Sequence, residues 1–254
     1  MPAGRDHGRS RGPPQLIPAN SAMMGGIVST ADQTYLFADL SGFTALTEVH
    51  GDEQAADFAA EFSSAVRGFL AEYSAEEVKT IGDAVMIRCP DAGQAIRLGL
   101  RIVQEVGGRP GFPTVRVGMD TGPAVERDGD WFGATVNLAA RVAGTARGGE
   151  VILTEATRVA SGQLDDLRLR ELGRRSLRNV AHPVSLFEAR AEGMRFGGEL
   201  LIDPVCRMAV DPSNSAGQLT HVGITYHFCS LACAGKFAAD PGLYATGEPG
   251  SAQS

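Results

Sequence analysis

Apolar residues recur with two different periods along the chain, and these periods predict alternating strands and helices. A short apolar run at 35–40 predicts a buried strand, which leads into the turn residues Ser41-Gly42. From about 44 to 73 the apolar side chains fall at helical spacing and predict one long amphipathic helix. Order is therefore expected to begin near residue 34.

Later segments with strand or helical spacing of apolar residues add further strands and helices to this first strand and helix. Short apolar runs predict strands at 78–81, 84–88, 115–120, 151–153, 167–172 and 184–189, with a ribbon at 124–130. Helical spacing predicts helices at 92–106 and 133–143. The order strand–helix–strand–strand–helix–strand predicts an α+β fold, a ferredoxin-like βαββαβ sheet with helices packed on it.

Composition changes along the chain and divides it into parts. Residues 1–33 are rich in Gly, Pro, Arg and Ser and predict a flexible leader. The periodic region at 34–190 forms the large domain, and the pattern is lost over a linker at 191–199. Residues 200–246 have their own cysteines and aromatics and predict a small second domain, followed by a flexible tail at 247–254.

Charge and hydropathy exclude some classes of function. The formal net charge of −7 disfavours nucleic-acid binding, so no nucleic-acid partner is expected. No run approaches eighteen consecutive apolar residues, so the sequence predicts no transmembrane segment. The arginines near the start are followed by prolines rather than by an apolar segment, which argues against a signal peptide.

The four cysteines are unevenly placed. Cys89 ends a predicted strand and is expected to be core packing, whereas Cys206, Cys229 and Cys233 cluster late in the chain. An odd trio makes a poor disulfide framework, and the sequence shows no export signal. We therefore expect a reduced, cytoplasmic setting.

Two carboxylates and one helix carry the candidate chemistry of the large domain. Asp39 ends a strand beside the start of a helix, and Asp83 lies at a hairpin tip. Carboxylates at neighbouring strand ends suit a two-metal phosphoryl-transfer site, and backbone N–H groups at the helix start can hold phosphate oxygens. Asn137 and Arg141 lie four positions apart on a predicted helix and share a face, where the arginine could neutralise a phosphoryl group.

Four separated segments in a fixed order resemble the motifs of class III nucleotidyl cyclases. They are Phe37-Ala38-Asp39-Leu40-Ser41-Gly42-Phe43-Thr44, Lys79-Thr80-Ile81-Gly82-Asp83, Val117-Gly118-Met119-Asp120-Thr121-Gly122 and Asp130-Trp131-Phe132-Gly133-Ala134-Thr135-Val136-Asn137-Leu138-Ala139-Ala140-Arg141. The resemblance spans about 34–190. It implies the fold predicted above, a site at a head-to-tail dimer interface and a cyclisation reaction on a nucleoside triphosphate.

The resemblance also implies a role for each matched residue around the phosphates. Asp39, Asp83 and the backbone of Leu40 match the ligands of two Mg²⁺ or Mn²⁺ ions per site. The residues that match the triphosphate-binding turn are Gly42, Phe43 and Thr44. Arg178 matches a position that often holds a lysine on the terminal phosphates, although Asn179 replaces the usual glycine after it.

The remaining matched residues concern the nucleoside. Asn137 and Arg141 match the pair that orients the ribose and stabilises the transition state, and Lys79 and Asp130 match the positions that choose the purine. A lysine donor and an aspartate acceptor complement adenine N1 and N6, whereas guanine presents the reverse edge. The expected function is an adenylate cyclase that makes cyclic AMP from ATP as a homodimer with shared sites. The alternatives are a guanylate-specific enzyme and a catalytically silent nucleotide-sensing or dimerisation module.

The C-terminal region resembles the YHS domain. The matching segments are Asp203-Pro204-Val205-Cys206-Arg207-Met208, Tyr226-His227-Phe228-Cys229-Ser230 with Cys233, and Phe237 with Asp240-Pro241-Gly242-Leu243-Tyr244. The usual glycine after the first cysteine is Arg207 here. Cys206, Cys229 and Cys233, with His227 or His221, could bind Zn²⁺ or Cu⁺ and regulate the cyclase. The alternative is that these cysteines are small buried hydrophobes.

Overall fold

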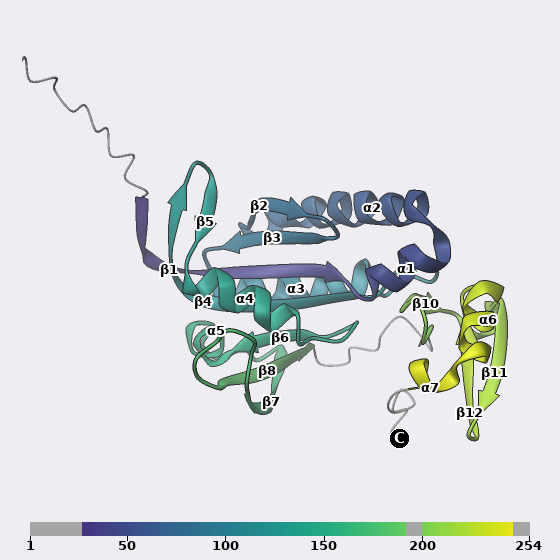
Figure 1. The fold of residues 1–254 in the computed structure, drawn as a ribbon. Helices are drawn as coiled ribbons and strands as arrows, with labels where there is room; N and C mark the ends of the chain where they lie inside the picture. The colour runs from purple at the N-terminus through teal and green to yellow at the C-terminus, as the bar shows by residue number, and fades with distance from the viewer. Residues whose placement is uncertain (1–26, 192–199, 246–254) are drawn as a thin grey trace, which may run out of the picture.

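The computed structural model describes residues 27–191 and 200–245 (Figure 1). The predicted leader up to residue 26, the linker at 192–199 and the tail from 246 lie outside the described residues. The helices and strands of the large domain are β1 (Ile27–Leu40), α1 (Phe43–His50), α2 (Asp52–Leu70), the 3-10 turn η1 (Ala71–Tyr73), β2 (Glu76–Ile81), β3 (Ala84–Cys89), α3 (Ala92–Glu105), β4 (Val115–Arg127), β5 (Asp130–Phe132), α4 (Ala134–Ala143), β6 (Val151–Thr154), α5 (Glu155–Ala160), β7 (Leu167–Arg175) and β8 (Val184–Ala191). Those of the C-terminal module are β9 (Leu201–Ile202), β10 (Ala209–Val210), η2 (Pro212–Asn214), β11 (Gly217–His221), β12 (Ile224–Phe228), α6 (Leu231–Ala239) and α7 (Pro241–Tyr244).

The large domain is built on one mixed sheet with the order β2-β3-β1-β4-β6-β8-β7, and β5 pairs with β4. The pairings within it are antiparallel except β4 with β6. Among the described residues, no helix is long and apolar enough to cross a membrane. The predicted α+β sheet with packed helices is confirmed.

Successive side chains of β1 point to opposite faces of the sheet and contribute to a different apolar cluster on each face. Leu36, Ala38 and Leu40 belong to the main core, which includes buried residues of α2 and α3. Tyr35 lies on the other face, in a cluster with Met86 and with Val136 and Ala139 of α4. The face that carries Tyr35 therefore also carries Asp39, because the two residues are an even number of positions apart.

Helix α4 approaches the backbone of β4 closely. A Cβ atom added at Gly118 would lie 1.9 Å from the backbone nitrogen of Ala143. Only a glycine at this position of the strand allows α4 to rest there. The motif glycine thus fixes the helix that carries Asn137 and Arg141.

Several predicted boundaries were wrong. The helix predicted over 44–73 is two helices, α1 and α2, because Gly51 interrupts it with a φ of 86°. Strand β1 begins at Ile27 rather than near residue 34, and residues 27–29 pair with Ala124, Val125 and Glu126 of β4. A register shift between Ser29 and Gln33, in a polar stretch, hid this extension from the hydrophobic pattern. Strand β4 also continues past Asp120 to Arg127, and α5 was not predicted.

The C-terminal module packs against the large domain beside α1 (Figure 1). One apolar cluster joins Leu46 of α1 and Ala55 of α2 to Cys206, Phe228 and other residues of the module. Backbone hydrogen bonds extend this contact, since Thr114 N donates to Arg207 O at 3.2 Å and Ala209 N donates to Phe112 O at 2.9 Å. The module and the cyclase-like unit therefore share a core and a hydrogen-bonded joint.

Candidate active site and metal centre

Two carboxylates meet where β1 ends. Asp39 is opposite Ala84 of β3 and Arg116 of β4, and Asp83 lies in the turn between β2 and β3 beside Gly82, which has a φ of 62°. Burial and the neighbouring Asp39 carboxylate raise the pKa of Asp83 to about 6. Arg116 donates two hydrogen bonds to Asp39 Oδ2, at 2.8 and 2.5 Å. Adjacent carboxylates of this kind suit a hard divalent cation. In the structure Arg116 neutralises part of the charge of Asp39.

The predicted phosphate turn follows directly. Gly42 has a φ of 76° and precedes α1, and Leu46 N donates to Gly42 O at 2.9 Å. Phe43 and Thr44 open the helix, so their N–H groups lie at its positive end. Arg207 of the C-terminal module lies against this turn, because a Cβ at Gly42 would be 2.5 Å from Arg207 Cγ.

Lys79 and Asp130 are brought together from β2 and β5. Lys79 Nζ lies 2.5 Å from Asp130 Oδ2, and the ammonium is 5.6 Å from the centre of the Phe132 ring. Desolvation by itself raises the pKa of Asp130, but hydrogen bonds from Lys79 and Trp131 N–H outweigh it and hold that pKa below its usual range. Lys79 is opposite Met86, which is opposite Phe37, so it occupies the same face of the sheet as Asp39.

Asn137 and Arg141 are both exposed on α4, four positions apart as predicted. Arg141 lines a pocket together with Thr145, Ser176 and Arg178. Two residues from separate predicted motifs, Arg141 and Arg178, therefore converge. Asn179 has a φ of 61°, a left-handed conformation that asparagine tolerates better than most residues, which explains why it can stand in place of glycine.

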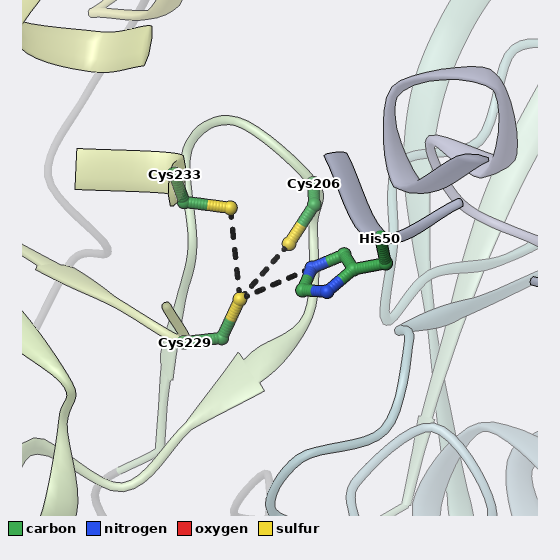
Figure 2. Close-up of side chains that lie close together, drawn as sticks. All are labelled: His50, Cys206, Cys229 and Cys233. Carbon is green, nitrogen blue, oxygen red and sulfur yellow. Dashed lines mark hydrogen bonds between the residues drawn. The ribbon is translucent and has the colours of Figure 1, made fainter. Parts of the chain in front are cut away.

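The three late cysteines gather with a histidine from the other domain. Cys229 Sγ lies 3.3 Å from Cys206 Sγ, 3.6 Å from Cys233 Sγ and 3.5 Å from Nε2 of His50 (Figure 2). His50 ends α1 of the large domain. Hydrogen bonds from Cys206 and then Cys229 lower the pKa of the Cys233 thiol.

The structure corrects the predicted histidine of this cluster. Nδ1 of His227 lies 3.2 Å from the Ser215 hydroxyl, and the His221 ring packs edge-on against Phe237. Neither belongs to the group of possible metal ligands, which His50 completes. Cys89 is fully buried in the main core, as predicted.

Sequence reasoning missed His50, Arg116 and Arg207 as parts of these sites. The dipeptide His50-Gly51 followed by Asp52 and Glu53 resembles a helix end and a new helix start, and it could have revealed the break. Arg116 lies on the strand before Val117-Gly118, outside the matched segment. Contacts of Arg207 depend on docking of the module and have no signal in the sequence.

Comparisons with known proteins identify two family models that match this chain. A model of the adenylate and guanylate cyclase catalytic domain matches residues 28–182, and a YHS domain model matches residues 201–248. A pH-sensitive adenylate cyclase of Mycobacterium tuberculosis (strain CDC 1551 / Oshkosh) is 40% identical over 167 residues, covering 65% of this chain and 42% of that protein. An adenylate cyclase of Streptomyces griseus is 35% identical over 134 residues, covering 50% of this chain and 34% of that protein.

The fold has solved counterparts. It is similar to adenylate cyclases from Trypanosoma brucei in their monomeric state, with a TM-score of 0.57 and 25% identity, covering 64% of this chain and 89% of that one. The chain spans less than half the length of the two bacterial relatives described above. The family model, in contrast, covers more than half of this chain and includes both aspartates, the Lys79–Asp130 pair and helix α4. The chain belongs to the family of adenylate and guanylate cyclase catalytic domains.

Proposed function

We propose that the protein is an adenylate cyclase, which converts ATP to 3′,5′-cyclic AMP and pyrophosphate. The observation that carries this proposal is the contact of Lys79 with Asp130 on the sheet face that also carries Asp39. Two bacterial relatives named as adenylate cyclases support it. Because all four cysteine thiols are free, a reduced cytoplasmic setting remains part of the proposal.

Base selection follows from the polarity of this pair. The Lys79 ammonium can donate to adenine N1, and the Asp130 carboxylate can accept from the adenine amino group. Guanine presents an acceptor and a donor in the reverse order, which would leave both side chains mismatched. A buried unpaired polar group costs about 1–3 kcal/mol, which corresponds to roughly a five- to hundredfold preference for ATP.

The reaction is an in-line displacement within one nucleotide. The ribose 3′-oxygen forms a bond to the α-phosphorus, the bond from that phosphorus to the bridging β-phosphate oxygen breaks, and the hydroxyl proton leaves to solvent. Two Mg²⁺ or Mn²⁺ ions held by Asp39, Asp83 and the Leu40 carbonyl would acidify the hydroxyl and neutralise the phosphates. Asn137 orients the ribose, while Arg141 and Arg178 stabilise charge on the α-phosphate and on the departing pyrophosphate.

A homodimer is proposed to complete each site. Asn137 and Arg141 are exposed on α4 and point away from the core of their own chain. Ile81 and Phe132 are each 50% exposed and lie beside Lys79, so apolar surface surrounds the base-selecting pair. A second copy would cover this surface and supply the missing half of each site.

The C-terminal module is proposed to regulate the cyclase through Arg207. Arg207 has a φ of 63°, where a glycine would be unstrained, and it presses on the turn at Gly42. Burial and then the neighbouring Arg147 lower the pKa of Arg207, so two guanidinium groups gather beside the proposed phosphate turn. Replacing Arg207 with glycine should raise the KM for ATP several-fold without reducing stability. An unchanged KM would show that Arg207 of the C-terminal module has no effect on ATP binding.

The decisive experiment measures cyclic nucleotide formation by the purified chain, with ATP or GTP and with Mn²⁺ or Mg²⁺. Cyclic AMP formation should disappear in Asp83→Asn and persist in the control Asp57→Asn, which alters an exposed carboxylate on α2. In Lys79→Met the preference for ATP over GTP should fall five- to hundredfold. Product from GTP alone would establish a guanylate cyclase, and no product from either nucleotide would favour the silent module.

A further inference from the structure

The contact between the two domains contains a cluster of four potential metal ligands. The ligand atoms of His50, Cys206, Cys229 and Cys233 all lie within 4.8 Å of one another. Figure 2 shows the three sulfurs and the imidazole directed toward a common point, with His50 approaching from α1 and the cysteines from the module. Three thiols and one imidazole form a borderline-soft donor set, which suits Zn²⁺ and disfavours Mg²⁺ or Ca²⁺.

The spacing of these atoms agrees with a tetrahedral centre. With bonds of about 2.3 Å to sulfur and about 2.0 Å to nitrogen, neighbouring ligand atoms are separated by roughly 3.5–3.8 Å. From Cys229 Sγ the distances are 3.3 Å to Cys206 Sγ, 3.6 Å to Cys233 Sγ and 3.5 Å to His50 Nε2, and the remaining pairs of ligand atoms lie within 4.8 Å of each other. A disulfide would require sulfurs about 2.05 Å apart, so the cysteines are placed around a common centre rather than bonded in pairs.

A fully buried carboxylate organises the backbone around the cluster. Asp203 accepts hydrogen bonds from Val205 N at 2.8 Å and Cys206 N at 3.3 Å through one oxygen, and from Cys229 N at 2.8 Å through the other. Ser230 accepts a hydrogen bond from Cys233 N at 3.2 Å and caps α6. These contacts fix all three cysteines relative to one another, as outer-shell groups do in structural metal sites.

The position of His50 distinguishes a metal site from simple core packing. The apolar cluster around the cysteines includes Leu46 and Phe228, and small hydrophobic side chains would fill such a core without an imidazole. His50 instead directs Nε2 at Cys229 from the last residue of α1, immediately before the turn at Gly51. The large domain thereby contributes a nitrogen ligand to a set of sulfurs that belong to the module.

We propose that His50, Cys206, Cys229 and Cys233 bind one Zn²⁺ ion that is shared by the two domains. The ion closes the joint at the C-terminal end of α1, while the N-terminal end of the same helix forms the proposed phosphate turn. The effect of zinc on the cyclase rests on the proposed function, but the metal site itself does not. A failure to bind zinc would therefore contradict only the metal site, and a failure to form cyclic AMP would contradict only the proposed cyclase function.

The test uses the full chain, purified under reducing conditions, stripped with a chelator and reloaded with Zn²⁺. We expect one zinc per chain after dialysis, and Co²⁺ in its place should give the intense visible bands of a tetrahedral thiolate site. In competition with a chromophoric chelator, His50→Ala should weaken zinc binding at least about tenfold. The matched control is His227→Ala, which should bind zinc like the unmodified chain.

Two further variants keep the proposal falsifiable if His50→Ala folds poorly. His50→Cys retains a ligand and should restore tight binding, whereas His50→Gln should bind as weakly as the alanine variant. Zinc should raise the melting temperature of the unmodified chain and of His227→Ala more than that of His50→Gln. The proposal is overturned if the unmodified chain retains no zinc, or if His50→Gln and His50→Ala bind zinc as tightly as His227→Ala.

Discussion

At the scale of single residues, Asp120 shows how a buried carboxyl group can be tolerated in this sheet. Asp120 on β4 is 5% exposed, and Thr154 Oγ1 donates a hydrogen bond to it at 2.5 Å. Burial raises its pKa to about 6, and the hydrogen bond offsets only part of that effect. The folded state therefore holds this proton more tightly than the unfolded state, in which the pKa is near 3.8.

Asp120→Asn should consequently change how stability depends on pH. Between about pH 4 and pH 6 the folded chain binds more protons than the unfolded chain, so the free energy of unfolding falls as the pH rises. Asparagine removes this contribution. Above pH 6 the variant should be more stable than the unmodified chain by as much as about 3 kcal/mol, and near pH 4 the two should be similar.

Urea unfolding of both chains at several pH values measures this difference. The comparison cancels the titration of other groups, because they are common to both chains. A difference that stays constant from pH 4 to pH 7 would show that Asp120 titrates normally and that the variant acts through packing alone.

Elements with local sequence signals could be predicted, and those that depend on tertiary contacts could not. The helix predicted at 92–106 is observed at Ala92–Glu105, because its apolar side chains repeat at helical spacing within one segment of the sequence. The four cyclase segments likewise identify their residues without reference to distant parts of the chain. His50 and Cys229 are in contact although they lie 179 positions apart in the sequence. The residues around each of them give no indication that the two meet, so this contact could not be predicted.

Gly51 separates α1 from α2 and aims His50 at the cysteines. Its φ of 86° and ψ of 163° are accessible essentially to glycine alone. An added Cβ would meet nothing within 4 Å, so any cost of a side chain here is backbone strain rather than collision. Gly51→Ala should therefore lower the free energy of unfolding by about 1–3 kcal/mol and also weaken zinc binding.

Gly68→Ala is the matched control for that substitution. Gly68 lies inside α2, is exposed, and also has nothing within 4 Å of an added Cβ. Because alanine is favoured over glycine in a helix, this variant should be more stable by about 0.5–1 kcal/mol. Chemical denaturation of both variants measures the contrast. Equal effects of the two substitutions would show that Gly51 holds no conformation that needs glycine.

On the scale of the whole molecule, α1 lies between the two proposed sites, one for phosphate and one for zinc. Its first turn comes shortly after Asp39 in the chain, and its last residue joins the cysteine cluster. Arg207 connects the same module to the first turn. If both proposals hold, zinc binding at one end of this eight-residue helix should alter phosphate binding at the other end.

The proposed dimer makes a prediction about mixtures of inactive chains. If the metal-binding aspartates act with Asn137 and Arg141 of a second copy, then Asp39→Asn and Arg141→Ala disable complementary halves of each site. Each variant alone should be inactive. In an equal mixture with free exchange, about half of the dimers contain both variants, and one of their two sites is intact. The mixture should regain about a quarter of the unmodified cyclase activity.

A second mixture controls for nonspecific recovery. Asp39→Asn and Asp83→Asn both disable the metal-binding half, so every site in their mixed dimer lacks an aspartate and no activity should return. Cyclic AMP formation from ATP is measured for each variant and for both mixtures at the same total protein concentration. If the first mixture stays as inactive as the second while exchange is verified by mass, each chain must build its site from its own residues. The exposure of Arg141 would then need a different explanation.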